Sequence, residues 1–358
     1  GGGGGGVLLL WGPTGRTGPM TSGALFCASQ ATMTVSVSVF LYEGVVYNLI
    51  FLRRILPAVG KEAYVTLFAV LFNSIWGLAL WSYLAAHAAN PGYVPKRWQE
   101  FVGSVGDALP VAPARPEWQP GKATFCKKCT IPRPERAHHC LVCEVCVLRM
   151  DHHCPWINNC VGFLNHKFFL LLGCYACASS LIALATSLPE LVYCTGAITR
   201  MEDGFAWQEK RLETSDVFVF IIFGLLALFV AVLLTPMLAT HLPLATQNLT
   251  TIEDNYDNMP NPFDQGSVCS NLAQIFGAYG PDWFVPILPW RPLSDGVSFA
   301  RSDERLGPDG LPERLGHGDD DLEKLWRLRY HVRTPAAVLN DVVDNGPLTS
   351  LARWWNGP

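Results

Sequence analysis

The feature that most limits how this chain can fold is a dense cluster of metal-binding residue types between residues 126 and 160. Two short pairs, Cys126-x2-Cys129 and Cys140-x2-Cys143, are each followed by a histidine, which is the spacing of tetrahedral zinc sites. Two closed sites need eight ligands, and this stretch offers eleven. The candidates are seven cysteines (126, 129, 140, 143, 146, 154 and 160) and four histidines (138, 139, 152 and 153).

Three of these candidates are surplus to two zinc sites, so a purely structural double-zinc module would carry unused thiol and imidazole. A surplus cysteine and histidine two residues apart, with an aspartate beside the histidine, form a nucleophile, a base and an orienting group. The stretch 151–156, Asp-His-His-Cys-Pro-Trp, contains this pattern. Spacing alone does not say which residues are surplus.

The composition indicates a membrane protein. Half of the residues are hydrophobic, 16% are charged and the mean hydropathy is +0.22. Four stretches approach the ~20 apolar residues that cross a ~30 Å hydrocarbon core. A buried core helix is the alternative for each, but four in one chain favour the membrane. The expected spans are residues 33–52, 63–86, 168–188, closed by Pro189, and 217–234, with Pro236 just after it.

Longer motifs carry a resemblance to a known family. His138-His139-Cys140-x2-Cys143-x2-Cys146, then Asp-His-His-Cys-Pro-Trp and Asn-Asn-Cys-Val-Gly at 158–162, resemble the cysteine-rich domain of the DHHC protein S-acyltransferases. Thr-Thr-x-Glu at 250–253 and an asparagine-containing segment ending Phe-Gly at 271–277 follow in the family's order. The resemblance implies an α-helical integral membrane protein. It would have four transmembrane helices and a cytosolic cysteine-rich double-zinc domain between helices 2 and 3.

The resemblance also implies how the ligands divide. It leaves Cys154, His152 and His138 outside both sites, as the ligand count requires. The implied cofactors are two structural Zn²⁺ ions, because eight protein ligands leave no open position for catalysis. One ion would take Cys126, Cys129, His139 and Cys146, and the other Cys140, Cys143, His153 and Cys160.

The implied activity is transfer of a palmitoyl group from palmitoyl-CoA to cysteine thiols of membrane-associated proteins. A free cysteine with a pKa near ~8.5 is mostly protonated at neutral pH, so its thiol needs a base. His152 can remove the proton from Cys154, and Asp151 can hold the imidazole in the right tautomer. We expect two steps, through an acyl-enzyme on Cys154.

Four further residue assignments follow from the resemblance. Thr251 is expected to bond to Asp151, and Asn271 to brace the backbone of the Thr-Thr-x-Glu motif. The phosphates of CoA need cations. The candidates near the site are Arg133, Arg136 and His138, with a solvated basic loop as the alternative.

Charge predicts the orientation and the partners. If all four helices span, the N-terminus, the zinc loop and the C-terminal tail share one side and carry 1, 10 and 9 Lys/Arg, against three in each opposite loop. The positive-inside rule then places the active site and both termini in the cytosol, although Arg53-Arg54 opposes this. The lipid bilayer is a partner. The formal net charge of −4 argues against a nucleic-acid partner. The membrane is expected to be the Golgi, the ER or the plasma membrane.

Two other classes of function compete with this hypothesis. A zinc-bearing membrane adaptor or ubiquitin-ligase-like module would leave Cys154 as a spare thiol, and acyl labelling of that cysteine discriminates. A transporter or channel is disfavoured, because the spans lack paired charges and broken-helix repeats.

The predicted organisation has seven segments, with a disordered N-terminal segment and a mostly disordered cytosolic tail at the ends. A short helix over 320–333 is expected within the tail. In order, the segments are the N-terminal segment 1–31, transmembrane helices 1 and 2 (32–90), a linker (91–121), the DHHC zinc domain (122–167), transmembrane helices 3 and 4 (168–240), the C-terminal motifs (241–290) and the tail (291–358).

Overall fold

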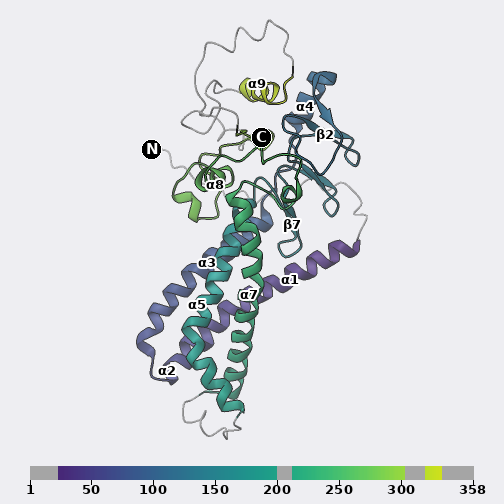
Figure 1. The fold of residues 1–358 in the computed structure, drawn as a ribbon. Coiled ribbons are helices and arrows are strands. Elements are labelled where there is room, and N and C mark those ends of the chain that lie inside the picture. Colours follow the sequence, from purple (N-terminus) through teal and green to yellow (C-terminus); the bar gives the residue numbers. More distant parts are fainter. Residues whose placement is uncertain (1–22, 200–211, 303–318, 333–358) are drawn as a thin grey trace, which may run out of the picture.

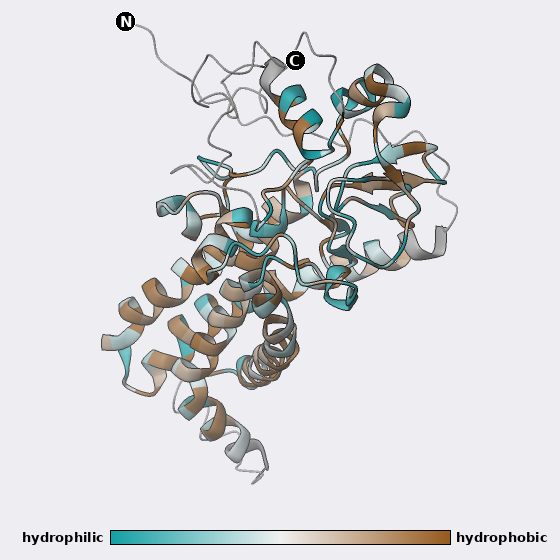
Figure 2. Cartoon of the chain, turned by 45° about the horizontal axis from the view of Figure 1, so that its top comes forward, coloured by the Kyte–Doolittle hydropathy of each residue, from teal (hydrophilic) through white to brown (hydrophobic). Residues whose placement is uncertain are grey.

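The computed structural model describes residues 23–199, 212–302 and 319–332. Four long helices form an elongated bundle, and the short strands and most of the shorter helices gather at one end of it (Figure 1). Each of the four is long and apolar enough to cross a membrane. The apolar residues concentrate on this bundle (Figure 2). The candidate spans are Cys27–Ala58, Glu62–Ala88, His166–Gly196 and Thr214–Thr246.

The membrane helices run farther than the apolar stretches suggest. Pro189 lies inside a helix, so the prediction that it closes the third span is wrong. Pro236, expected just after the fourth span, also lies inside a helix. Proline is tolerated in membrane helices because neighbouring helices and local adjustments satisfy the freed backbone groups. The spans are built from α1 (Gly23–Val46), the π-helix η1 (Tyr47–Ile55) and α2 (Leu56–Ala58); η2 (Glu62–Tyr64) and α3 (Val65–Ala88); α5 (His166–Thr199); and α7 (Thr214–Thr246).

Aromatic stacking and close helix approach hold the bundle together. α5 packs against α3 on one side and α7 on the other, while α1 crosses the bundle obliquely (Figure 1). The rings of Tyr47 and Phe72 stack with centroids 3.9 Å apart in the buried core. A Cβ on Gly173 of α5 would lie 2.7 Å from Met237 of α7, so the missing side chain lets these helices approach.

The zinc domain consists of three β-hairpins that repeat every 14 residues. The turn of each hairpin begins after a cysteine: Cys126, Cys140 and Cys154. In the second hairpin His139 pairs with Cys146, and in the third the equivalent pair is His153 with Cys160. The hairpins are β2 (Ala123–Cys126) with β3 (Ile131–Arg133), β4 (His138–Cys140) with β5 (Val145–Val147), and β6 (His152–Cys154) with β7 (Asn159–Val161).

The segment predicted to be a linker and part of the predicted disordered tail are folded together. The linker contains α4 (Lys96–Val105), the short helix η3 (Gly106–Ala108) and β1 (Val111–Ala112), which pairs in parallel with β2. The tail contains α9 (Asp319–Arg329), which overlaps the short helix expected over 320–333. These two predictions are wrong because Trp98 of α4 and Trp326 of α9 are both fully buried in one aromatic core, with centroids 5.7 Å apart.

The rest of the C-terminal region lies at the same end of the bundle as the hairpins (Figure 1). It contains η4 (Glu253–Asn255), α8 (Val268–Phe276) and η5 (Pro281–Phe284). α8 packs against α7 and α5. Of the expected disordered N-terminal segment, residues 1–22 lie outside the described residues, and α1 begins at Gly23.

Candidate active site

Each Cys-x2-Cys pair forms the turn of a hairpin in which the first sulfur accepts a backbone hydrogen bond. The Cys129 N–H donates to Cys126 Sγ over 3.4 Å, and the Cys143 N–H donates to Cys140 Sγ over 3.3 Å. The residue after each pair has a positive φ, 56° and 57°, which closes the turn. Both turns therefore present two thiols to one point in space.

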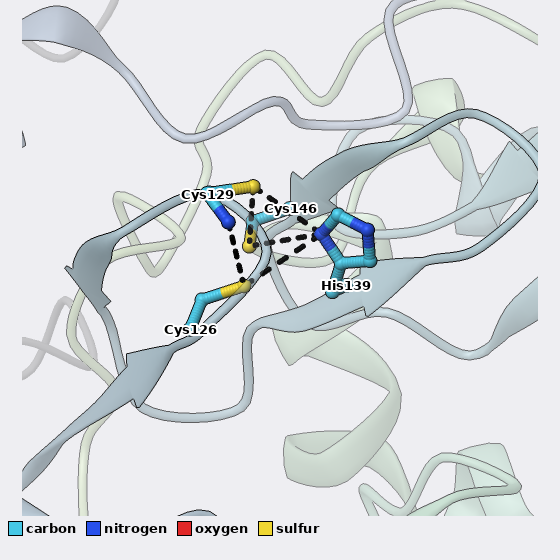
Figure 3. Close-up of side chains that lie close together, drawn as sticks. All are labelled: Cys126, Cys129, His139 and Cys146. Atoms are coloured by element: carbon cyan, nitrogen blue, oxygen red, sulfur yellow. Dashed lines mark hydrogen bonds between the residues drawn. The ribbon is translucent and has the colours of Figure 1, made fainter. Parts of the chain in front are cut away.

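The first group of ligand atoms joins two consecutive hairpins (Figure 3). His139 Nδ1 lies 3.7 Å from Cys126 Sγ, 3.2 Å from Cys129 Sγ and 3.9 Å from Cys146 Sγ. The two cysteines of the first turn thus meet a histidine and a cysteine from the strands of the second hairpin.

The second group repeats this arrangement one hairpin further on. His153 Nδ1 lies 3.7 Å from Cys140 Sγ, 3.4 Å from Cys143 Sγ and 3.7 Å from Cys160 Sγ. The second turn is therefore tied to the strands of the third hairpin. The structure brings together all eight residues that the resemblance implies as ligands, in the implied groups of four.

Both groups fit zinc. Tetrahedral Zn²⁺ with Zn–S near 2.3 Å and Zn–N near 2.0–2.1 Å places its ligand atoms about 3.5–3.8 Å apart. The distances from imidazole nitrogen to sulfur in the two groups span 3.2–3.9 Å. Three thiols and one imidazole fill four positions, so a bound zinc would hold the hairpins in place and have no position open to substrate.

Cys154, the first residue of the third turn, belongs to neither group. The second-cysteine position of the turn is occupied by Ile157, which is buried. The residue that closes the turn, Asn158, has a positive φ of 48°, as in the other two hairpins. This turn thus has the backbone of a zinc-binding turn, but only one thiol.

Asp151 and His152 lie on the same hairpin as Cys154. Asp151 Oδ2 is 2.5 Å from His152 Nδ1. Burial opposes ionisation of Asp151, but the hydrogen bond from His152 and nearby imidazoles outweigh it, so the Asp151 pKa falls well below its usual range. Burial alone would lower the His152 pKa, yet hydrogen bonds with Asp151 and Cys154 raise it to about 9. The ring therefore binds a proton readily and contacts the thiol through its remaining nitrogen.

The membrane helices surround the thiol. Cys154 is 5% exposed and packs in an apolar cluster with Tyr83 of α3, Phe168 of α5 and Ala245 of α7. The turn that follows is held by hydroxyl groups from two membrane helices. Thr32 of α1 donates to the Pro155 carbonyl over 2.8 Å, and Tyr83 donates to the Trp156 carbonyl over 3.0 Å. The thiol thus lies where the hairpins meet the ends of the membrane helices.

The Thr-Thr-x-Glu motif contacts the same aspartate. The Thr251 N–H donates to Asp151 Oδ1 over 2.9 Å, and its hydroxyl donates to the Asp151 carbonyl over 2.7 Å. Asn271 differs from the expectation, because its amide donates to the Thr246 carbonyl and to Asp264, outside the motif. It fastens the end of α7 to the loop before α8, since that loop passes closer to it than the motif does.

Comparisons with known proteins identify the family of this chain. Residues 119–257 match the family model described as DHHC palmitoyltransferase. The chain is 30% identical over 302 residues to palmitoyltransferase ZDHHC15A of Danio rerio, covering 77% of this chain and 85% of the relative. The chain belongs to the DHHC palmitoyltransferase family. It is also 30% identical to probable protein S-acyltransferase 12 of Arabidopsis thaliana (63% of this chain, 75% of the relative) and 31% identical to human palmitoyltransferase ZDHHC20 (57% and 53%).

In this DHHC protein, the three residues expected to bind CoA phosphates line one recess, together with Arg115 and Lys122. Arg133 is half-buried in the lining of this recess, and its Nε donates a hydrogen bond to the Thr124 hydroxyl. Burial, reinforced by Arg133, lowers the pKa of His138 to about 4. His138 is therefore neutral, so it can offer phosphate a hydrogen bond but no charge.

Arg136 is occupied elsewhere, which differs from its predicted role. Its Nε and Nη2 atoms each donate to Glu253 over 2.7 Å, and its Nη1 and Nη2 donate to Asn248. The guanidinium also lies 4.8 Å from the ring centroid of Phe263 and 4.9 Å from that of Phe299. Because its donors are already bonded within the protein, Arg136 joins the zinc domain to the Thr-Thr-x-Glu motif. Arg133 still lines the recess and keeps its predicted role.

Sequence reasoning assigned no structural role to Glu253, Asn248 or Arg149. Asn248 is 1% exposed, and its side-chain oxygen accepts from Arg149 Nη2 over 2.9 Å. Its φ of 53° lets it close the end of α7. The only available signal was the position of Asn248 two residues before the Thr-Thr-x-Glu motif. That signal does not identify partners about a hundred residues away in the chain.

Proposed function

We propose that this protein transfers a long-chain acyl group from palmitoyl-CoA to cysteine thiols of membrane-associated proteins, through a thioester on Cys154. The observation that supports this most directly is the position of Cys154. It is the one thiol of the 126–160 cluster outside both Cys3His groups, and it lies against an Asp151–His152 pair. Its surroundings are the apolar ends of membrane helices, where an acyl chain gains about 0.8 kcal/mol for each buried CH2.

In the first step the proton of the Cys154 thiol moves to the His152 nitrogen that is not bonded to Asp151. The thiolate attacks the carbonyl carbon of palmitoyl-CoA, so a new S–C bond forms and the C–S bond to CoA breaks. The CoA sulfur leaves with the proton held by His152. Asp151 stabilises the imidazolium between these transfers, as its ionised carboxylate at 2.5 Å allows.

In the second step a cysteine thiol of the substrate protein gives its proton to His152 and attacks the thioester carbonyl. The bond to Cys154 breaks, and the Cys154 sulfur takes the proton back. Neither step consumes a net proton, so one histidine serves as base and as acid in both.

We propose that the hairpins and both chain ends face the cytosol. Thiols at ligand spacing favour a reducing compartment. Arg53-Arg54 opposes this orientation under the positive-inside rule, but part of the positive charge on that side is neutralised. At the end of the bundle away from the hairpins, Arg54 pairs with Asp216 over 2.8 Å and Lys61 pairs with Glu190 over 2.6 Å. Arg133, Arg115 and Lys122 would then meet the phosphates of CoA arriving from the cytosol. The Golgi, the ER and the plasma membrane are the compartments that we propose.

The test is acyl labelling of the purified protein in detergent with a palmitoyl-CoA analogue that can be detected. Wild type should become labelled, and neutral hydroxylamine should release the label, as it does from a thioester. Cys154→Ser should keep its zinc and take no label. A Ser variant that labels like wild type would move the nucleophile elsewhere, and an unlabelled wild type would favour the adaptor hypothesis.

A further inference from the structure

A second imidazole lies beside the catalytic pair. His241, near the end of α7, places its Nδ1 3.6 Å from Asp151 Oδ2, the same oxygen that holds His152. This distance is too long for a hydrogen bond. It is short enough that His241 could take over the oxygen if either ring turned. The His241 side chain is 12% exposed and that of Asp151 is 1% exposed, so little water separates them.

A third ring completes the enclosure. Phe169 of α5 meets His152 edge-on, with centroids 5.2 Å apart, and meets His241 edge-on at 5.0 Å. The two imidazoles are 5.3 Å apart. The rings form a triangle whose corners come from β6, α5 and α7, and Phe169 is buried. His152 therefore cannot rotate without displacing a side chain from a membrane helix.

A metal ion does not explain this grouping. Asp151, His152 and His241 have ligand atoms within 4.8 Å of one another. An ion held by Asp151 and His152 at about 2.0–2.2 Å from each would keep their ligand atoms about 3 Å apart or more. These atoms are 2.5 Å apart and share a proton directly. The geometry suits a hydrogen-bonded base with packed neighbours.

We propose that His241 and Phe169 are positioning residues for His152 in the acyl transfer, an inference that rests on the proposed role of Cys154. Phe169 limits the rotation of the His152 ring, so that its free nitrogen stays on the thiol. His241, with its Nδ1 3.6 Å from Asp151 Oδ2, fills the remaining side of the carboxylate without drawing that oxygen away from His152. The membrane helices thereby set the orientation of a base that belongs to the zinc domain.

Three substitutions at His241 separate this role from simple packing. The amide nitrogen of an Asn side chain falls near the Nδ1 of His, whereas that of Gln falls near Nε2. His241→Asn should therefore preserve the group facing Asp151, and His241→Gln should not. His241→Lys places a permanent charge beside Asp151 that competes for Oδ2. Leu242→Ala is the matched control, because the Leu242 side chain on the same turn of α7 is exposed.

The measurement is the single-turnover rate of Cys154 acylation on the full chain in lipid nanodiscs, with zinc content as a check on folding. General-base catalysis contributes about 100- to 10,000-fold, so a misplaced base loses part of that factor. We expect the Asn variant within about threefold of wild type, the Gln variant about tenfold slower and the Lys variant about 100-fold slower. The KM for palmitoyl-CoA and the zinc content should stay unchanged in all three.

A second readout removes acyl-CoA from the experiment. The alkylation rate of Cys154 by iodoacetamide, followed by mass spectrometry, reports activation of the thiol alone and should fall in the order Asn, Gln, Lys. Phe169→Leu should slow both reactions. Combined with His241→Gln, it should lose less than the product of the single effects, because both act through one ring.

Two results would overturn the inference. If Asn, Gln and Lys all match wild type, His241 positions nothing. If all three lose activity equally and release zinc, its role is structural only. An unlabelled Cys154 in the wild-type protein would instead defeat the proposed function itself, so the two failures can be told apart.

Discussion

Arg136 and Glu253 form a two-pronged ion pair, with both N–O distances at 2.7 Å, and their side chains are 2% and 1% exposed. Burial would raise the pKa of Glu253, but Arg136 outweighs it and holds that pKa below its usual value. The pair joins the loop before the second hairpin to the Thr-Thr-x-Glu motif, which in turn contacts Asp151. Arg136, which the sequence suggests as a phosphate-binding residue, thus connects two segments of the protein interior.

Breaking this tie should destabilise the domain. Arg136→Gln leaves the Glu253 carboxylate buried without its partner, which typically costs about 3–5 kcal/mol. We expect a lower unfolding temperature in detergent and slower acylation. Arg133→Gln, at the half-buried edge of the recess, is the control and should raise the KM for palmitoyl-CoA at an unchanged unfolding temperature. Equal stability of the two variants would contradict the assignment of Arg136 to structure.

Ligand and catalytic residues should separate in a zinc assay. Cys129→Ala removes one of four ligands from a closed site, so both zinc content and detergent stability should fall. His152→Ala removes no ligand and should keep two zinc ions per chain while losing acylation. The check is metal analysis of the purified variants alongside labelling. Full zinc and activity in Cys129→Ala would refute the ligand assignment.

The acylation rate should depend on the hydroxyl group of Thr251 more than on the size of its side chain. Thr251→Val keeps the shape but removes the hydrogen bond to the Asp151 carbonyl, a loss of about 0.5–1.5 kcal/mol. Thr251→Ser keeps the hydroxyl and should acylate like wild type, whereas the Val variant should be slower. The acylation rates of the two variants give the comparison, and a Val variant as fast as the Ser variant would remove Thr251 from the support of the site.

Acyl-chain preference should respond to Ser179. Span three is rich in small side chains. The Ser179 side chain is 1% exposed and donates to the Ala176 carbonyl. If Ser179 faces the acyl chain, the enzyme should accept stearoyl-CoA about as well as palmitoyl-CoA. Ser179→Tyr should then shift preference towards myristoyl-CoA in a graded way, because one methylene is worth only about 1–3 kcal/mol.

Competition between mixed acyl-CoAs measures this preference directly. Leu181→Tyr is the control, since it adds the same ring at a side chain that is 52% exposed. An unchanged chain-length profile in Ser179→Tyr would mean that Ser179 only lets helices approach, as Gly173 does against Met237.

Topology needs a probe other than the natural sequon. Asn248-Leu249-Thr250 is an N-glycosylation sequence, but the Asn248 amide is buried and donates to the Phe263 carbonyl. The absence of a glycan there is expected in either orientation. An epitope tag after Pro358 should be reached by antibody only once the plasma membrane is permeabilised. A tag between residues 200 and 211 should be reached without permeabilisation if the protein lies in the plasma membrane, and only after the organelle membranes are permeabilised if it lies in the Golgi or the ER. The reverse pattern would overturn the orientation.

The parts of this molecule that could be predicted are those encoded over short distances. The ligands of each zinc group lie within 21 residues of one another, on neighbouring hairpins, so motif spacing was enough to propose them. Four apolar stretches likewise predicted four helices, although their ends could not be placed, because α5 and α7 continue through proline. The family resemblance supplied the division of the ligands, which spacing had left open.

The parts that could not be predicted depend on contacts between distant segments. Arg136 and Glu253 are 117 positions apart, and nothing in either local sequence indicates the other. Trp98 and Trp326 each lie in a stretch that resembles a linker or a tail, and their helices are stabilised by packing against each other. His241 carries no motif, and its proximity to Asp151 arises only from the packing of α7.

The repeat of three hairpins has a consequence for how a reactive thiol can be kept free of metal. Each zinc group takes its turn from one hairpin and its strands from the next, so the series ends with a turn that has no following hairpin to face. Cys154 occupies that last turn, and Ile157 stands where a second thiol would complete a chelating pair. A metal ion that binds the protein therefore meets two complete four-ligand sites, whereas the third turn offers only a single thiol. The proposed nucleophile therefore lies on the same rigid hairpin framework as the zinc ligands but belongs to neither group of four.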